Sequence, residues 1–254
     1  MRGNIYHLPL AALLLTSGLA LWGQPQTGQQ KAVQRNWKLN PSNPAPEPTN
    51  EEERARRQAR GAMFDDPKHA KRRLDIPDPN EGRIVYGRSP GTPLKIPALP
   101  VSESDTVIIG SVASLQPYFS NDRTSIYHEL VIQVEQVLKD NSLVVAAPNG
   151  SVAIVGEGGA LRLPNGKVAE EFIPPDSEND IRTGGRYVLF LRYRPQGEAF
   201  SLIKAWQLMG GRAVPMALWD IHEMRNGLSP YAAMDEATFI KAVRDAVSQS
   251  EARL

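Results

Sequence analysis

Apolar and polar residues alternate through the centre of the chain. In the segment YHELVIQVEQVLK, which begins at Tyr127, apolar positions share one face and polar positions share the other. The apolar set is Ile126, Leu130, Ile132 and Val134, and the polar set is Glu129, Gln133 and Glu135. A period of two is typical of a strand with one face on a core and the other in water. The phase breaks at Val137–Leu138, where we expect a bulge.

Apolar runs and turn sequences predict further strands around this one. Thr106–Val112 is an apolar run, as in a strand covered on both faces, and its Gly110 predicts a bend or bulge. Shorter strands are predicted at Ser142–Ala146, Val152–Val155, Ala160–Leu163, Tyr187–Arg194, Phe200–Trp206 and Arg212–Met216. Glycine-rich or Asn-Gly turns separate several of them, which indicates an antiparallel barrel or sandwich. We predict a mainly β domain over residues 101–216, a small antiparallel OB-like barrel of about six or seven strands.

Helical spacing replaces strand spacing near the C-terminus. An apolar stripe runs through Phe239, Ile240, Val243 and Val247, and Asp235 precedes it as a candidate N-cap. We therefore predict a C-terminal helical extension over residues 217–254 that covers an open side of the barrel.

The first 23 residues have the layout of a secretory signal. Arg2 supplies the basic start, Leu8–Trp22 is apolar, and Ala20 is a small residue suited to cleavage, with Gly23 as a second option. The apolar run is shorter than the roughly 20 residues that span a bilayer. We expect a signal peptide over 1–23 and an exported protein, periplasmic or secreted. Without cleavage, the same segment would leave the chain membrane-anchored.

Residues 24–100 are predicted to form a disordered linker, because 12 of the chain's 21 prolines lie there. One short helix interrupts it near residues 50–63, where Thr49 and Glu52 match a capping box. Little apolar surface lies on any face of this helix, so we expect it to be marginal alone.

Charge is distributed unevenly along the chain. The net charge of +1 is the sum of about +1 over residues 1–23, +5 over 24–100, −3 over 101–216 and −2 over 217–254. An acidic barrel argues against nucleic acid as its ligand. The basic linker could contact an anionic membrane surface weakly, bind a cell-envelope polymer, or dock on its own barrel. The chain has no cysteine, which excludes a disulfide scaffold, a thiolate zinc site and a cysteine nucleophile.

No catalytic, cofactor-binding or metal-binding residues are predicted, and no cofactor. Of the four histidines, His7 lies in the signal segment and His69 in the linker, while His128 and His222 lack metal-ligand spacing. We interpret His128 as a hydrogen-bonded residue of a strand. The paired acids Glu170–Glu171 and Asp176–Glu178 lie in AEEFIPPDSEND, which we interpret as a solvated loop.

Aromatic side chains offer a different kind of site. A groove lined by Tyr118, Tyr127, Tyr193 or Trp206 would mark a ligand site on the barrel. Burial of these rings would mean that the strands enclose only their own core.

Two segments carry a resemblance to known proteins: SDTVIIGSVASLQPYFSNDRTSIYHELVIQVEQVLKD and GGRYVLFLRYRPQGEAFSLIKAWQLMGGRAVPM. They resemble a group of uncharacterised exported bacterial proteins. More distantly, the strand order is similar to the OB-type barrel of the tissue inhibitor of metalloproteinases and netrin modules, over residues 102–216. In that family an N-terminal cysteine chelates the protease metal, and disulfides hold it. This chain has no cysteine, so the resemblance implies only a barrel that presents loops for binding.

The function predicted from these features is a non-enzymatic binding or interaction module of the cell envelope. Its partner would be a protein or an envelope polymer. The alternative is an exported hydrolase with an unrecognised active site, built from His128, His222 or the acids of residues 170–180. Single-stranded nucleic-acid binding is the weakest hypothesis, because the barrel is acidic.

Overall fold

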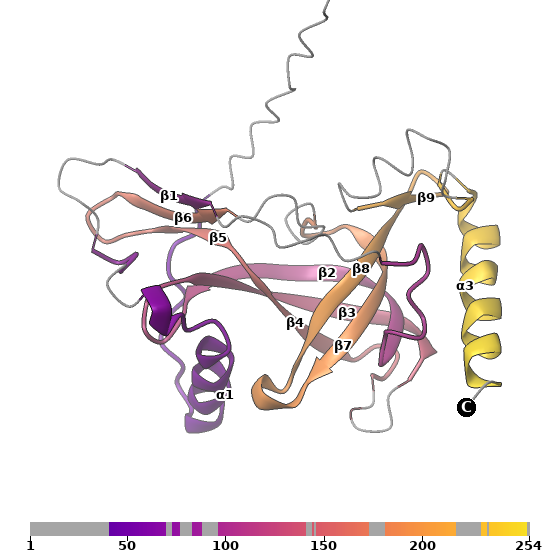
Figure 1. The fold of residues 1–254 in the computed structure, drawn as a ribbon, viewed down its shortest axis with the longest axis horizontal. Helices are drawn as coiled ribbons and strands as arrows, with labels where there is room; N and C mark the ends of the chain where they lie inside the picture. Colours follow the sequence, from indigo (N-terminus) through magenta and orange to yellow (C-terminus); the bar gives the residue numbers. More distant parts are fainter. Residues whose placement is uncertain are drawn as a thin grey trace, which may run out of the picture. The chain divides into compact units, whose positions relative to one another are not determined.

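The computed structural model describes residues 41–69, 73–76, 83–87, 96–140, 144, 146–172, 181–216, 230–232 and 234–252. A six-stranded sheet runs in the order β4-β3-β2-β7-β8-β9, and an additional pairing of β4 with β8 closes its first five strands into a barrel (Figure 1). The strands are β2 (Thr106–Phe119), β3 (Ile126–Lys139), β4 (Ser151–Glu157), β7 (Arg186–Arg194), β8 (Ala199–Met209) and β9 (Arg212–Pro215). Neighbours along the sheet are antiparallel, and the closing pair β4–β8 is parallel. The predicted mainly β barrel is confirmed, with five strands in the closed ring.

A second, three-stranded sheet has the order β1-β6-β5. It consists of β1 (Arg83–Gly87), β6 (Val168–Phe172) and β5 (Gly159–Arg162), and β1 pairs with β6 in parallel. Ser42 forms a bridge to Leu161 on the other edge of β5. The edge of β5 is thereby paired with the segment that precedes the first helix, which limits its exposure to other chains.

Side chains from all five barrel strands form the interior. The buried set includes Ile108, Val112, Leu130, Ile132, Val152, Ile154, Tyr187, Leu189, Leu191, Phe200 and Ala205. Tyr187, Leu189 and Leu191 come from alternate positions of β7, so one face of this strand contributes to the interior.

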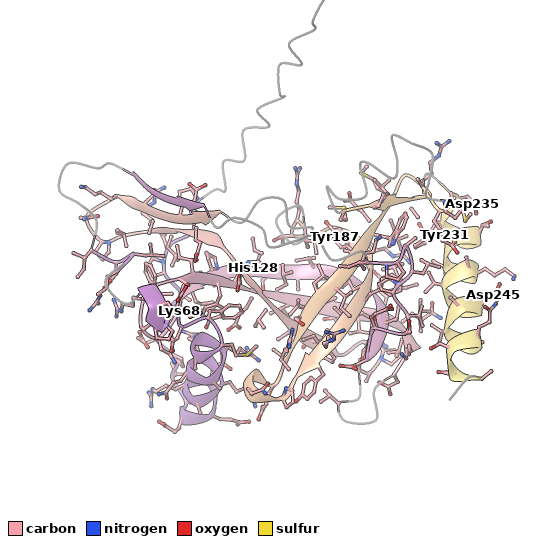
Figure 2. All side chains as sticks on the ribbon, in the orientation of Figure 1. Lys68, His128, Tyr187, Tyr231, Asp235 and Asp245 are labelled. Carbon is pink, nitrogen blue, oxygen red and sulfur yellow. The ribbon has the colours of Figure 1, made fainter. Side chains whose placement is uncertain are left out.

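The C-terminal helix α3 (Glu236–Glu251) covers an outer face of the barrel. Phe239, Val243 and Val247 are buried in a second cluster, which includes Val188 and Trp206 from the strands. Asp235 is the N-cap, as predicted, and its side chain accepts a 2.9 Å hydrogen bond from the Thr238 amide. Figure 2 shows Asp235 at the start of α3, with Tyr231 beside it.

Two predicted irregularities are present in the strand register. Between Val107 and Ile108 the register of β2 passes over Leu138 of β3, at the predicted bulge. A second shift falls between Ile109 and Gly110, at the predicted bend. A Cβ atom at Gly110 would lie 2.6 Å from the carbonyl oxygen of Gln133, so the backbones approach closely there.

The predicted linker differs most from the structure. Helix α1 (Glu51–Ala62) is formed near the predicted bounds, but its N-cap is Asn50, not Thr49, and the Asn50 side chain accepts from the Glu53 amide. The helix is not isolated, because Arg60 and Gly61 are buried against the rest of the fold. Beyond it come the 3-10 turn η1 (Pro67–His69) and the fully buried Leu74. The described residues between 41 and 100 are thus part of the folded unit.

Other predictions lie outside the described residues. These are the signal segment 1–23, the linker residues 24–40, His222, Asp176 and Glu178. The predicted strand Ser142–Ala146 is described only at Val144 and Ala146. No helix in the described part of the chain is long and apolar enough to cross a membrane.

Candidate functional site

Helix α1 covers one end, near Glu129, of the face of β3 that the alternating pattern assigns to water. Gln133 and Glu135 are exposed as predicted, but Glu129 is buried. Its Oε2 atom accepts a 2.8 Å hydrogen bond from Nη1 of Arg60, and only 9% of each side chain is exposed. The prediction that Glu129 faces solvent is wrong, because a helix from outside the barrel lies over it.

The Arg60–Glu129 ion pair joins three elements. Arg60 Nε also donates to the carbonyl oxygen of Gly197, 3.0 Å away in the β7–β8 connection. Burial raises the pKa of Glu129, and the neighbouring Arg60 guanidinium opposes this rise. A buried charge needs such a partner, since an unpaired one costs several kcal/mol. The pair therefore anchors α1 to the barrel in one position.

Aromatic side chains form a second contact between the α1 region and the barrel, next to the Arg60–Glu129 pair. The Tyr127 ring stacks on Phe64 with 4.9 Å between centroids, and on Tyr118 with 5.4 Å. The guanidinium carbon of Arg57 lies 4.8 Å from the centroid of Tyr118. Stacked rings and a cation on a ring face each add to the attraction from burial alone. Helix α1 and the residues after it thus pack on Tyr118 and Tyr127, which lie at the end of the β2–β3 hairpin.

The turn of the β2–β3 hairpin is tied to the residues that follow α1. The Asp66 amide donates to Oδ2 of Asp122, and the Asp122 amide donates to Oδ1 of Asp65. Partial burial raises the pKa of Asp122, but hydrogen bonds from Thr124, Ser120 and Asp66 outweigh it and lower the pKa to about 2. The carboxylate is therefore ionised, and it organises the turn as a hydrogen-bond acceptor.

A cavity of about 620 Å³ lies among these elements. We call it the arginine–tyrosine cavity and define it by Arg54, Arg57, Arg123, Tyr118 and Tyr127. Its other lining residues come from the segment before α1, from the hairpin turn, from Asp75 and from the end of β5. Many of them are apolar, including four prolines: Pro44, Pro48, Pro117 and Pro164.

The charged side chains in the lining are of both signs. Three arginines face two acids, Glu47 and Asp75. Asp75 accepts from Arg123 at 2.9 Å and also pairs with Arg73 at 2.7 Å. The hydrogen bond from Arg73 is the main cause that lowers the pKa of Asp75, with Arg123 adding to it, so this acid is ionised. The lining then carries one net positive charge.

Two of the four aromatic residues named from the sequence belong to the cavity. Tyr118 and Tyr127 line it, whereas Trp206 is buried under α3 and Tyr193 packs on the barrel interior. Tyr127 and Trp206 are buried, as expected for rings of the core, whereas Tyr118 and Tyr193 are partly buried. A ligand groove lined by these rings stays a prediction.

The titratable residues named from the sequence lie elsewhere. His128 is buried on β3 (Figure 2), and its Nδ1 donates to the carbonyl oxygen of Gly158 at 3.0 Å, in agreement with the predicted hydrogen-bonded strand histidine. Glu170 and Glu171 are buried in β6, so the prediction of a solvated loop is wrong for them. Glu171 Oε2 accepts from the Ile126 amide at 2.5 Å. None of these three residues lines the arginine–tyrosine cavity.

Sequence reasoning missed the three arginines of the cavity. The only signal was indirect, namely the basic charge of residues 24–100 and the hypothesis that this arm docks on its own barrel. Among the residues described, no group of three or more histidines, aspartates or glutamates is arranged to hold a metal ion.

Comparison with known proteins does not assign this chain to a family. No protein-family model matches the chain, and no curated protein is significantly similar to it. The class that the fold defines is a mainly β protein with a closed five-stranded barrel and a helix on its outer face.

Proposed function

We propose that the protein is an exported, non-enzymatic binding module of the cell envelope, and that its ligand site is the arginine–tyrosine cavity. Export rests on the N-terminal pattern of Arg2 followed by the apolar run Leu8–Trp22. In this proposal the ligand is a polymer of the cell envelope, to which the cleft offers both polar and apolar walls.

The observation that carries the proposal is the cavity itself. Its volume of about 620 Å³ falls within the range of small-molecule sites, and charged and polar side chains share its lining with apolar ones. The buried Arg60–Glu129 pair and the Asp66–Asp122 hydrogen bond hold its walls. A preformed site binds more tightly because less ordering is needed on binding.

The chemistry of the lining favours binding over catalysis. A general acid or base has to reach the reacting atoms, and the buried His128, Glu170 and Glu171 lie outside the lining. The charged groups that do line it are arginines and the ionised Asp75, together with the exposed Glu47. Such groups orient a ligand by hydrogen bonds and charge.

Co-sedimentation with insoluble cell wall tests the proposal. The protein is produced in a Gram-negative host and recovered from the periplasm, which also checks export and cleavage. We expect it to pellet with purified cell-wall sacculi. Ala45→Trp, which fills the cavity from a lining position, should reduce the affinity about tenfold or more, equivalent to about 1.4 kcal/mol.

Met209→Trp is the matched control, because it adds the same ring at an exposed site outside the lining. It should pellet like the wild type, and both variants should keep the wild-type melting temperature. Wild-type protein that stays in solution would remove the polymer-binding proposal. Equal pelleting of Ala45→Trp and wild type would remove the cavity as the site.

A further inference from the structure

We infer that the arginine–tyrosine cavity takes an acidic saccharide, with its anionic group on the arginines and its ring against the tyrosine and proline walls. This inference rests on the proposed function, and it names the ligand class of the same site.

The first argument is that three arginines line the same cavity. Arg54 and Arg57 come from α1, and Arg123 comes from the turn of the β2–β3 hairpin, more than 60 residues further along the chain. A guanidinium presents a planar set of donors that matches carboxylate, sulfate or phosphate oxygens. Arginines from two separate elements on one lining form a site for an anion.

The second argument is that these arginines can change partners. Arg54 pairs with Glu51 and Arg123 with Asp75, and the two arginine side chains are 54% and 52% exposed. Exposed ion pairs contribute little to stability, so a ligand anion can replace or join the carboxylate at small cost.

Arg57 adds its charge to the same lining. Its Nη1 donates to the carbonyl oxygen of Pro46 at 2.8 Å, and its guanidinium carbon lies 4.8 Å from the centroid of Tyr118. These two contacts hold the cation beside a ring of the cavity wall.

The two acids decide which kind of anion fits. Glu47 and Asp75 lie in the same lining as the arginines. A dense polyanion, such as a polyphosphate, would meet their repulsion along with the attraction of the arginines. A sugar acid carries one charge per ring together with several hydroxyl groups, and hydroxyls donate well to carboxylates. The mixed lining therefore favours a hydroxyl-rich ligand of moderate charge.

The apolar walls suit the other side of such a ligand. Tyr118, Phe119, Pro117, Pro44 and Pro48 line the cavity beside the charges. Tyr118 and Phe119 are only partly buried, so they retain surface for a ligand. The C–H face of a sugar ring packs on aromatic and proline surfaces, while its edge hydroxyls reach polar groups.

Titration calorimetry with three probes tests the inference. At low ionic strength we expect trigalacturonate to bind the protein. Maltotriose, which has the same number of rings without carboxylates, should bind at least about tenfold more weakly. Inorganic tripolyphosphate, which has charge without a sugar ring, should also bind at least about tenfold more weakly.

Two double variants that lose the same charge distinguish direct contacts of the ligand with the cavity arginines from attraction by the net charge of the protein. Arg54→Gln/Arg123→Gln removes two lining cations and should raise the Kd for trigalacturonate about tenfold or more. Arg56→Gln/Arg73→Gln is the control. Arg56 lies on the same helix, and Arg73 pairs with the same Asp75, yet neither lines the cavity. The control should stay within about twofold of wild type.

Each other outcome overturns the inference. Equal affinity for maltotriose would show that the charge is not recognised, and equal or tighter binding of tripolyphosphate would show a plain anion site. Equal loss in both double variants would reduce the effect to net charge. If trigalacturonate does not bind while wild type, but not Ala45→Trp, still pellets with cell wall, the ligand class is wrong and the proposed function stands.

Discussion

Glu129 owes its environment to an arginine 69 positions earlier in the chain. A carboxylate at this depth is unfavourable alone, because burial disfavours its charged form. Arg60 offsets that cost through a direct hydrogen bond at 2.8 Å. The pair contributes orientation more than net stability, since the desolvation of both charges opposes their attraction.

A double-mutant cycle on this pair should show strong coupling. Arg60→Met leaves Glu129 buried without a partner and should lower the free energy of unfolding by about 3–5 kcal/mol. Arg60→Met/Glu129→Leu removes both charges and should cost less than Arg60→Met alone. Urea unfolding gives both values. Arg56→Gln loses the ion pairs with Glu52 and with Glu198, whose side chains are both largely exposed. It should therefore change stability by about 0.5 kcal/mol or less. Additive costs at Arg60 and Glu129 would contradict the interaction.

Asp122 should make the protein sensitive to acid. Its pKa is lowered on folding to about 2, so its ionised form stabilises the fold above the ordinary pKa of about 4. This contribution is lost as the pH falls from about 4 to about 2. Asp122→Asn lacks the carboxylate, so its deficit in stability relative to wild type should shrink over that range.

The measurement is the urea midpoint of both proteins between pH 6 and pH 2. Asp245→Asn is the control, because Asp245 (Figure 2) is an exposed carboxylate of α3 that pairs with Lys241. Its curve should run parallel to that of wild type. A constant deficit of Asp122→Asn at every pH would assign its effect to side-chain shape, not to titration.

Among the elements, β2 depends on a glycine where its register shifts. Gly110 lies where the backbone of β3 comes closest, and an added Cβ would lie 2.6 Å from both the Gln133 oxygen and Ile132 Cγ2. One of these contacts is backbone, which cannot rotate away. The bulge therefore requires glycine for space.

Gly110→Ala should lower the free energy of unfolding by about 1–3 kcal/mol, the usual cost of overpacking. The neighbouring Ser111→Ala, at a partly exposed position of the same strand, should change it by about 0.5 kcal/mol or less. Thermal or urea unfolding measures both. A stabilised Gly110→Ala would mean that the reduced entropy of the unfolded chain outweighs the contact, and that β2 can shift to accept the methyl group.

Helix α1 is an element that its own sequence supports weakly. It carries arginines where a surface helix would present apolar residues, and isolated helices of this length are marginal in water. Tertiary contacts, and not the intrinsic helix propensity of its residues, stabilise α1. Gly61 lets α1 approach Asn121, whose side chain donates to the carbonyl oxygen of Gln58. The helix is stable because the barrel holds it.

For the whole molecule, charge complementarity contributes to holding helix α1, a described part of the basic segment 24–100, on the barrel. Arg60 pairs with Glu129 and Arg56 with Glu198, so cations of α1 meet anions of the barrel. The hypothesis that the arm docks on its own barrel is confirmed for α1. One consequence is that a fragment starting at residue 101 lacks a wall of the arginine–tyrosine cavity, and binding has to be measured on the full protein.

Short-range pattern predicted much of the fold because strand periodicity, bulges and caps are local. The alternation of β3, the bulge at Leu138, the bend at Gly110 and the cap at Asp235 all depend on a few neighbouring residues. A period of two divides a strand into two faces, and a polar side chain just before an apolar stripe marks a helix start.

Long-range contact determined the rest. Strand β6 contains Glu170 and Glu171. Two adjacent acids in an acidic segment predict exposure to solvent, yet both are buried in a strand that pairs with β1 and β5. The cavity joins Arg57, Tyr118 and Leu161, which are far apart in the sequence. Periodicity shows that a face is polar, but burial and pKa depend on which distant segment covers that face, and only the folded chain brings those segments together.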